Sequence, residues 1–309
     1  MIFRKKLFLI VIFISCSSVN SFQLTMMLPK QNKIPHISNL HHYYRLSRPE
    51  SIPYEFGLPL MGSYLSTNSI NVITNPSIIL LGILSVLIGS NSMIINDYFD
   101  YRNGCDRKKD DKILNQKIIK PEEILHISNI LNLLSYSLIC YFVNDDLIRI
   151  ILSNAIIFSY IYTPILKPIT LIKNLSVSLI ITQSLTMGGL ITNTKPYSLL
   201  PAAIYLFNFV MWQELQLDNL DMCHDKRCGI KTFPVLFGYR KTNILSLLFL
   251  MAGTFIPFGT KSHLFILLQT PIIIKTFSAI CLNEKLPKKE IKMSRLIILL
   301  SGIHMSLLS

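Results

Sequence analysis

Uncharged apolar runs recur along the chain and are separated by short polar links. One of them, ILLGILSVLIGSNSMII at residues 79–95, contains no charged residue. Because the hydrocarbon core of a membrane takes roughly 20 apolar residues per helical span, such runs predict transmembrane helices. We therefore expect an all-α membrane protein, built as a bundle of about nine transmembrane helices. The predicted spans cover residues 52–70, 76–95, 122–143, 146–163, 174–192, 197–213, 242–258, 264–282 and 292–309.

Composition and net charge agree with a membrane protein. Half of the 309 residues are apolar and 15% are charged, whereas soluble domains carry about 25% charged residues. The net charge of +13 follows from the Lys and Arg residues that membrane proteins gather on one side of the bilayer. A nucleic-acid partner is not expected, because the chain contains no soluble basic domain.

The distribution of basic residues predicts which helix ends share a side of the membrane. If the side on which the second span ends is called side A, the alternating topology places 21 Lys and Arg residues on side A and three on side B. Such asymmetry marks one membrane face. All the long charged loops fall on side A, so the chemistry is expected at the side-A mouth of the bundle. These loops cover residues 96–121, 164–173, 214–241 and 283–291.

The N-terminal region resembles a targeting sequence. Residues 1–21 combine the basic MIFRKK with an apolar core of eight residues, LFLIVIFI, and a small polar stretch, which is typical of a signal peptide. Residues 22–45 are basic and contain no acidic residue, which is typical of an organelle transit peptide. The two in series indicate a plastid membrane. An ordinary signal sequence, leading to another organelle or an endomembrane, is the alternative.

Aspartates gather where two of the predicted spans end. Asp97 and Asp100 lie three residues apart after the second span, and Asp218, Asp221 and Asp225 follow the sixth at spacings that share one helix face. Like charges on one face repel, so a cation is expected between them. Carboxylates suit Mg²⁺, which takes one or two of them together with substrate phosphates. Two Asp-rich loops at one mouth would therefore clamp a diphosphate through Mg²⁺.

Two other interpretations use residues of the same loops. Either aspartate cluster alone would suit a solvated loop whose acids pair with neighbouring Lys and Arg residues. Two clusters on one membrane face favour a functional site instead, since charged groups at membrane helices are functional by default. Cys223, His224 and Cys228 lie close together, but a zinc site needs four ligands in a recognised spacing.

Four segments resemble motifs of the UbiA family of intramembrane prenyltransferases, and they occur in the family's order. NDYFDYRNGCD at residues 96–106 resembles the first aspartate motif, NDxxDxxxD. DNLDMCHDKRCGIKTFPVLFG at residues 218–238 resembles the second, DxxDxxxDxxxGxxTLPVxxG. YTPILK at residues 162–167 resembles the YSPPLK-type loop, and LSRPES at residues 46–51 resembles the start of the first span. The resemblance indicates one prenyltransferase domain at residues 46–309.

The resemblance implies a transferase that uses Mg²⁺ to move a prenyl group from an allylic prenyl diphosphate to an acceptor within the bilayer. The implied acceptor is hydrophobic and often an aromatic ring, as in quinone biosynthesis. The implied metal ligands are Asn96, Asp97, Asp100, Asp106, Asp218, Asp221 and Asp225, with Asp97, Asp100, Asp221 and Asp225 as catalytic candidates. The implied diphosphate contacts are Arg48, Lys112, Tyr162, Lys167 and Lys226. Tyr162 alternatively faces the allylic cation or anchors its helix at the membrane interface.

The first motif departs from the family pattern in one place. The usual third Asp falls at Gly104, and Asp106 follows two positions later. A turn at Asn103 and Gly104 would bring Asp106 back toward the site. The Gly-x-Asp ending is similar to naphthoate enzymes, whereas GIKTFPVLFG is similar to homogentisate and chlorophyllide enzymes, so the acceptor stays open among them.

Two further functions compete with prenyl transfer. A polytopic transporter is expected to place ionisable residues near the bilayer midplane, whereas most acids here lie at the ends of predicted spans. A catalytically inactive UbiA-like protein would keep the fold without the transfer, and the shifted Asp106 keeps that alternative open.

Overall fold

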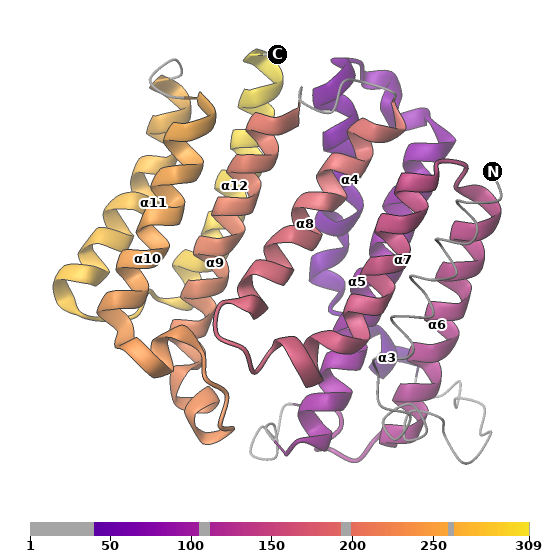
Figure 1. Ribbon diagram of the computed structural model, residues 1–309, viewed down its shortest axis with the longest axis horizontal. Helices are drawn as coiled ribbons and strands as arrows, with labels where there is room; N and C mark the ends of the chain where they lie inside the picture. Colours follow the sequence, from indigo (N-terminus) through magenta and orange to yellow (C-terminus); the bar gives the residue numbers. More distant parts are fainter. Residues whose placement is uncertain (1–39, 105–111, 193–198, 259–262, 309) are drawn as a thin grey trace, which may run out of the picture.

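The computed structural model describes residues 40–104, 112–192, 199–258 and 263–308, and within these ranges it contains helices and connections but no strand. Nine helices of 16 residues or more lie side by side in the described residues (Figure 1). Each overlaps one predicted span, which confirms the all-α bundle. These helices are α4 (Ile52–Thr67), α5 (Pro76–Arg102), α6 (Pro121–Phe142), α7 (Asp146–Ile161), α8 (Ile172–Ile191), α9 (Leu200–Arg227), α10 (Phe233–Phe258), α11 (His263–Leu282) and α12 (Lys288–Leu308).

Short elements connect the long helices. A first helix, α3 (Leu40–Leu46), precedes the short turn η2 (Pro49–Ser51), and η3 (Ile70–Thr74) joins α4 to α5. The π-helical turn η4 (Tyr162–Leu166) follows α7. The predicted signal segment and most of the predicted transit segment lie outside the described residues, and their assignment stays a prediction.

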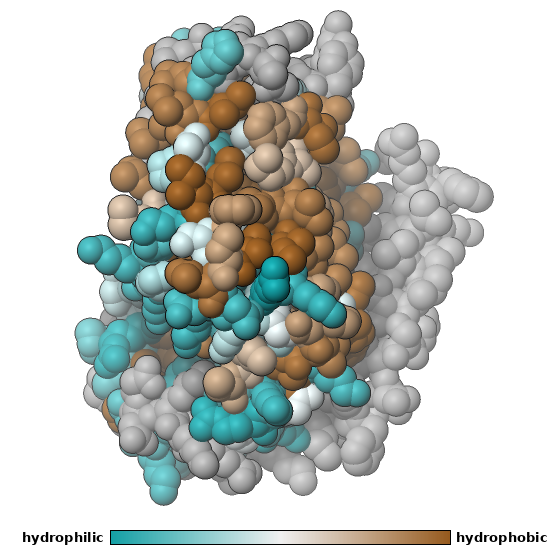
Figure 2. All heavy atoms as spheres, turned by 90° about the vertical axis from the view of Figure 1, so that its left-hand side faces the viewer, coloured by the Kyte–Doolittle hydropathy of each residue, from teal (hydrophilic) through white to brown (hydrophobic). Residues whose placement is uncertain are grey.

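The exterior of the bundle suits a lipid environment. Six of the described helices, namely α5, α6, α7 with η4, α8, α10 and α11, are long and apolar enough to cross a membrane. Large apolar side chains such as Leu248, Ile256 and Leu267 are exposed on α10 and α11. Figure 2 shows this side of the molecule as a broad apolar surface, with hydrophilic side chains mostly in its lower half. The chain is therefore an integral, multi-pass membrane protein.

The two helices that carry the aspartates extend beyond their predicted ends. Helix α5 continues to Arg102 and α9 to Arg227, so the acids occupy the last turns of helices and not the loops after them. A glycine with a positive φ follows each end, Gly104 at 77° and Gly229 at 71°. Glycine adopts this left-handed conformation without steric cost and commonly terminates helices. The predicted Asn103–Gly104 turn is thus present, whereas Asp106 lies outside the described residues.

Helices α4 and α8 approach so closely that glycine is required at the contact. A Cβ on Gly62 would lie 1.9 Å from the carbonyl oxygen of Leu185, and one on Gly188 would lie 1.9 Å from that of Pro59. The Ser63 hydroxyl donates a hydrogen bond to the Gly188 carbonyl oxygen across the same contact (2.7 Å). Small residues and hydroxyl bonds are how membrane helices associate, because lipid supplies no hydrophobic drive between them.

Buried polar side chains hold α9 against α10 and α11. Gln216 of α9 donates to Asn243 (3.1 Å) and Ser246 (2.6 Å) of α10. The Trp212 indole donates to Thr276 of α11 (3.0 Å). These bonds fix α9 against its neighbours and so fix the direction of its acidic end.

The close contact of α4 and α8 gives a stability prediction. Gly62→Ala places a methyl group on the Leu185 carbonyl oxygen, so thermal unfolding in detergent should occur at a lower temperature, with a loss of about 1–3 kcal/mol. Gly57→Ala in the same helix is the control, because a Cβ there meets nothing within 4 Å. Equal unfolding temperatures for the two variants would contradict the packing described.

Candidate functional site

The first aspartate is paired with cations from two other segments. Asp97, 7% exposed near the end of α5, accepts from Arg48 Nη2 at 3.2 Å and from Lys112 Nζ at 2.7 Å. Arg48 lies between α3 and η2 with φ at 51°, a conformation that residues with a Cβ adopt at some cost in free energy. Two of the predicted diphosphate-binding residues therefore already meet at a predicted metal ligand.

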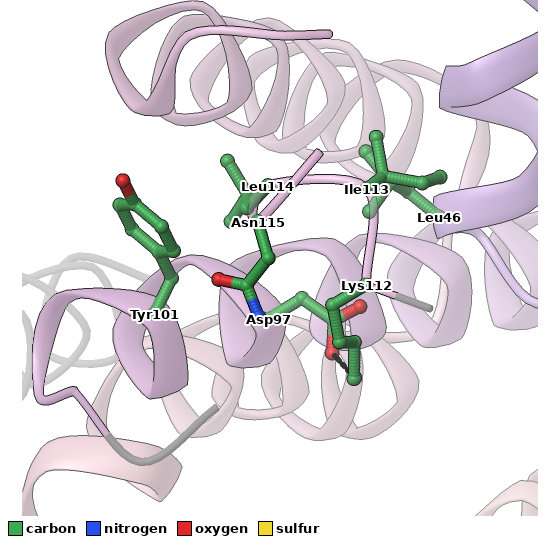
Figure 3. A pocket seen from close by; sticks show the side chains of 7 residues that line it. All are labelled: Leu46, Asp97, Tyr101, Lys112, Ile113, Leu114 and Asn115. Atoms are coloured by element: carbon green, nitrogen blue, oxygen red, sulfur yellow. Dashed lines mark hydrogen bonds and ion pairs between the residues drawn. The ribbon is translucent and has the colours of Figure 1, made fainter. Parts of the chain in front are cut away.

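The segment after the first motif folds back over Asp97. Figure 3 shows Lys112 reaching the carboxylate, with Leu114 and Asn115 beside it. A small cavity of about 10 Å³ lies here, large enough for roughly one water molecule. Asp97 is thus shielded on one side by the chain that follows its own helix.

The second aspartate of α5 is bound by the YTPILK segment. Lys167 Nζ lies 2.6 and 2.8 Å from the two carboxylate oxygens of Asp100. The Asn96 amide also donates to Asp100 (3.3 Å), and its carbonyl oxygen accepts from the Thr163 hydroxyl (2.8 Å). The π-helical turn η4 places Thr163 and Lys167 on this site, and such turns occur frequently at functional sites.

The acidic face of α9 has a similar arrangement. Asp218, only 2% exposed, pairs with Lys173 and accepts from the Asn174 amide at 3.0 Å, both at the start of α8. Asp225 is also buried, whereas Asp221 is exposed. Lys226 is exposed in the last turn of α9 and lies off the face that the three aspartates share.

The Asp225 carboxyl is held in an unfavourable environment. Its pKa is raised to about 6, mainly by burial and also by the Asp218 and Asp221 carboxylates, while Lys173 partly offsets them. Its Oδ2 atom is buried and has no hydrogen-bond partner among the described residues. When the carboxyl group is ionised, this oxygen has no positively charged partner, and a bound cation would provide one.

Two observations place the two aspartate clusters at one mouth of the bundle. Tyr162 is close enough to Asp100, Lys173 and Asp218 for the charges of all three to act on its hydroxyl group. The Thr170 hydroxyl donates to the Lys231 carbonyl oxygen, joining the segment after η4 to the segment after α9. The ends of α5 and α9 therefore share one face of the bundle, as the charge distribution predicts.

Three polar residues of the site escape the sequence motifs. Lys173 and Asn174 bind Asp218 although they follow the YTPILK segment by several residues. Glu214 lies one helical turn before Asp218 and acts electrostatically on both Tyr162 and Lys173. Its spacing of four from Asp218 extends the acidic face by one turn and is the one signal that the sequence offers for it.

The site does not form a complete metal centre from side chains alone. No group of three His, Cys, Asp or Glu side chains that could hold a metal ion occurs in the part of the chain that the structure describes, and this includes Cys223, His224 and Cys228. Mg²⁺ needs no such group, since it usually keeps several waters and binds one or two carboxylates plus substrate phosphates. The oxygen ligands present fit that mode of binding.

Comparison with protein families gives one match across most of the chain. The model of the UbiA prenyltransferase family matches residues 58–293. This range contains both aspartate clusters and the YTPILK segment.

Two curated relatives are archaeal enzymes of one name. A digeranylgeranylglyceryl phosphate synthase of Methanospirillum hungatei is 32% identical over 161 residues, covering 52% of this chain and 57% of that protein. The synthase of the same name from Methanosphaera stadtmanae is 29% identical over 171 residues, covering 55% and 61%. The chain thus matches about three fifths of the length of these relatives.

Solved structures share the fold. A structure described as concerning digeranylgeranylglyceryl phosphate synthase in membranes aligns with a TM-score of 0.65 and 21% identity, over 87% of this chain and 99% of that chain. A UbiA homologue from Archaeoglobus fulgidus bound to DMAPP and Mg²⁺ aligns with a TM-score of 0.59 and 17% identity, over 85% and 98%. At these identities the likeness concerns the arrangement of helices.

The buried pair of Lys173 and Asp218 gives a second stability prediction. Lys173→Met leaves the Asp218 carboxylate buried and unpaired, which should cost about 3–5 kcal/mol of unfolding free energy. Adding Asp218→Asn to that variant should recover most of the loss. Asp146→Asn is the control, because its pair with Arg149 is 66% exposed on the aspartate side and should change stability little. Equal losses in the single and double variants would contradict the pairing.

The raised pKa of Asp225 gives a pH prediction for the protein without metal. Because the folded-state pKa of about 6 exceeds the ordinary value of 3.8, folding favours the protonated acid, and this contribution is lost as pH rises from about 4 to about 6. Asp225→Asn should therefore unfold at a higher temperature than the wild type at pH 7, with a smaller difference at pH 4. A variant that is less stable than wild type at pH 7 would contradict this.

Proposed function

The chain belongs to the UbiA prenyltransferase family, and we propose that it transfers a prenyl group from an allylic prenyl diphosphate to a hydrophobic acceptor with the help of Mg²⁺. The proposal rests on the side-A mouth of the bundle, where two acidic helix ends are paired with four basic side chains. A UbiA homologue of the same fold is bound to DMAPP and Mg²⁺, which supports this choice of donor and metal.

The metal ligands in this proposal come from the two helix ends. Asp225 has a buried oxygen without a partner, and three of the other aspartates already attract cations. Bound Mg²⁺ supplies a Lewis acid that draws charge from the departing diphosphate. The proposed ligands are Asn96, Asp97 and Asp100 of α5 with Asp218, Asp221 and Asp225 of α9, together with Asp106 outside the described residues.

The basic side chains are proposed to bind the diphosphate. Arg48, Lys112 and Lys167 contact aspartates directly, and Lys173 joins them as a fourth. With Mg²⁺ offsetting the charge of the carboxylates, the same cations would face the phosphate oxygens and stabilise the charge of the leaving group. Lys226 stands at the exposed rim and would meet the diphosphate only from outside.

The apolar helices provide the second requirement of the reaction. Breaking the bond between the first prenyl carbon and oxygen leaves an allylic cation, which water would quench. The apolar helices of the bundle would exclude water from that carbon. Tyr162, between the two clusters, is placed to contact the diphosphate or to face the cation, a contact worth about 2 kcal/mol in a dry site.

Two classes of acceptor are compatible with this site. The sequence motifs favour an aromatic acceptor, such as a quinone precursor. The curated relatives are named as synthases of digeranylgeranylglyceryl phosphate, which favours a prenylated glyceryl phosphate.

A substrate panel tests the function. Purified protein in membranes is supplied with labelled prenyl diphosphates of several lengths, and with naphthoate, homogentisate, chlorophyllide or geranylgeranylglyceryl phosphate as acceptor. We expect transfer to one acceptor class that requires Mg²⁺. Asp97→Asn and Asp221→Asn should each lower the transfer rate by roughly 100-fold or more, because each removes charge that binds the metal.

The matched control is Asp146→Asn, which removes an exposed carboxylate on side B. Among the residues that the structure describes, Asp146 pairs with Arg149 alone, at 3.3 Å on the surface, so its loss should leave transfer unchanged. The proposal fails if no donor and acceptor react, or if the variants at Asp97 and Asp221 transfer at the wild-type rate.

A further inference from the structure

One carboxylate within the bundle belongs to neither acidic cluster. Glu55 lies in the first turn of α4, and its Oε1 atom accepts a hydrogen bond from the Ser51 hydroxyl at 2.9 Å. Its Oε2 atom is buried and has no partner among the described residues. Since burial of an unpartnered carboxylate oxygen costs free energy, and ionisable residues within membrane helices are functional by default, this side chain requires an explanation.

A glycine on α5 makes the space for this carboxyl group. A Cβ built on Gly89 would lie 2.6 Å from Cδ of Glu55 and 2.7 and 2.8 Å from its two oxygens. Any larger residue at position 89 would therefore displace the carboxyl group. Glu55 is seated against the backbone of α5 rather than directed at lipid.

The face of α5 on which Glu55 rests is the face of the active site. Asn96 and Asp100 follow Gly89 by seven and eleven residues, which is close to two and three helical turns. At 1.5 Å per residue, the Glu55 carboxyl group lies about 10 Å deeper along α5 than Asn96. Glu55 is thus a carboxylate below the first aspartate cluster, on the same side of the helix.

Further hydroxyl groups without partners lie at this depth on α8. Helices α4 and α8 run in the same direction, with Gly62 against Leu185 and Ser63 bonded to Gly188. That alignment makes Ser178 and Thr182 level with Glu55. Both hydroxyl oxygens are buried and lack partners among the described residues, so α8 also carries unpartnered polar atoms at the level of Glu55.

We propose that Glu55 accepts the proton that the acceptor loses during prenyl transfer. The inference rests on the proposed function, which puts the diphosphate at the aspartates. The acceptor atom approaches the first prenyl carbon of the allylic cation from the side away from the departing diphosphate, and that side is the deeper one. Glu55 provides a carboxylate at that depth, with one oxygen available for a hydrogen bond.

The step balances in atoms and charge. The acceptor, an alcohol or an electron-rich aromatic ring, forms a bond from its oxygen or carbon to the first prenyl carbon. The bond from that carbon to oxygen breaks, and its electron pair leaves with the diphosphate. The proton from the acceptor oxygen or carbon passes to Oε2 of Glu55, which later returns it to water. The reacting group of the acceptor is therefore neutral and bears a proton, since a phosphate at this position would be repelled.

Glu55→Gln tests the proposal, because glutamine keeps the shape of the side chain but cannot accept the proton. With the acceptor that the panel identifies, kcat for transfer should fall roughly 100-fold or more, within the usual range for loss of a general base. The affinity for a non-hydrolysable thio-analogue of the prenyl diphosphate, measured with Mg²⁺ by thermal shift, should equal that of wild type. Glu55→Asp should recover part of the rate.

Two further variants separate the proposed role from a structural one. Glu122→Gln, at an exposed helix start, is the control and should transfer at the wild-type rate. Gly89→Ala pushes the Glu55 carboxyl group out of its seat without removing it, so it should lower kcat while the analogue still binds. An active wild type with an equally active Glu55→Gln variant overturns this inference alone, as does loss of analogue binding in that variant. A wild type that transfers to no acceptor overturns the proposed function itself.

Discussion

Ion pairs at the side-A mouth hold several segments of the bundle in place. Asp97, Asp100 and Asp218 are all buried, and each is paired with at least one Lys or Arg from another segment. A carboxylate buried without a cation would cost several kcal/mol, so the pairs determine where the partner segments lie. The pairs tie the residues before α4, the turn after α7 and the start of α8 to the ends of α5 and α9. The resulting cluster of cations and carboxylates is also what a Mg²⁺–diphosphate complex requires.

The rest of the bundle serves to hold these two helix ends at a fixed separation. Glycines bring α4 and α8 into backbone contact, and amide and indole bonds hold α9 against α10 and α11. Because lipid provides no hydrophobic drive between helices, close packing and buried hydrogen bonds must supply the association. The aspartates lie on the ends of these tightly packed helices, so their positions are more restricted than they would be on loops.

The order of the helices and the shared face of the aspartates could be predicted from the sequence. The length of each apolar run reports a membrane span, the helical spacing places side chains on one face, and the basic loops mark one side of the membrane. The Asn103–Gly104 turn was also visible, since glycine marks a helix end. The sequence did not predict how far α5 and α9 extend, because polar helix ends that are stabilised by distant partners lack an apolar signature. Lys173 was missed for the same reason: its role depends on the packing of α8 beside α9. The seat of Glu55 against Gly89 depends likewise on two helices whose contact no local pattern encodes.

We propose that the two acidic helix ends act as one site for metal and diphosphate. The direct measurement is the binding of Mn²⁺, in place of Mg²⁺, by electron paramagnetic resonance in the presence and absence of a thio-analogue of prenyl diphosphate. We expect the metal and the analogue to bind tightly only together, and we expect Asp100→Asn and Asp218→Asn, on different helices, each to abolish that joint binding. Tight joint binding that survives in either variant would contradict the claim that both helix ends form the site.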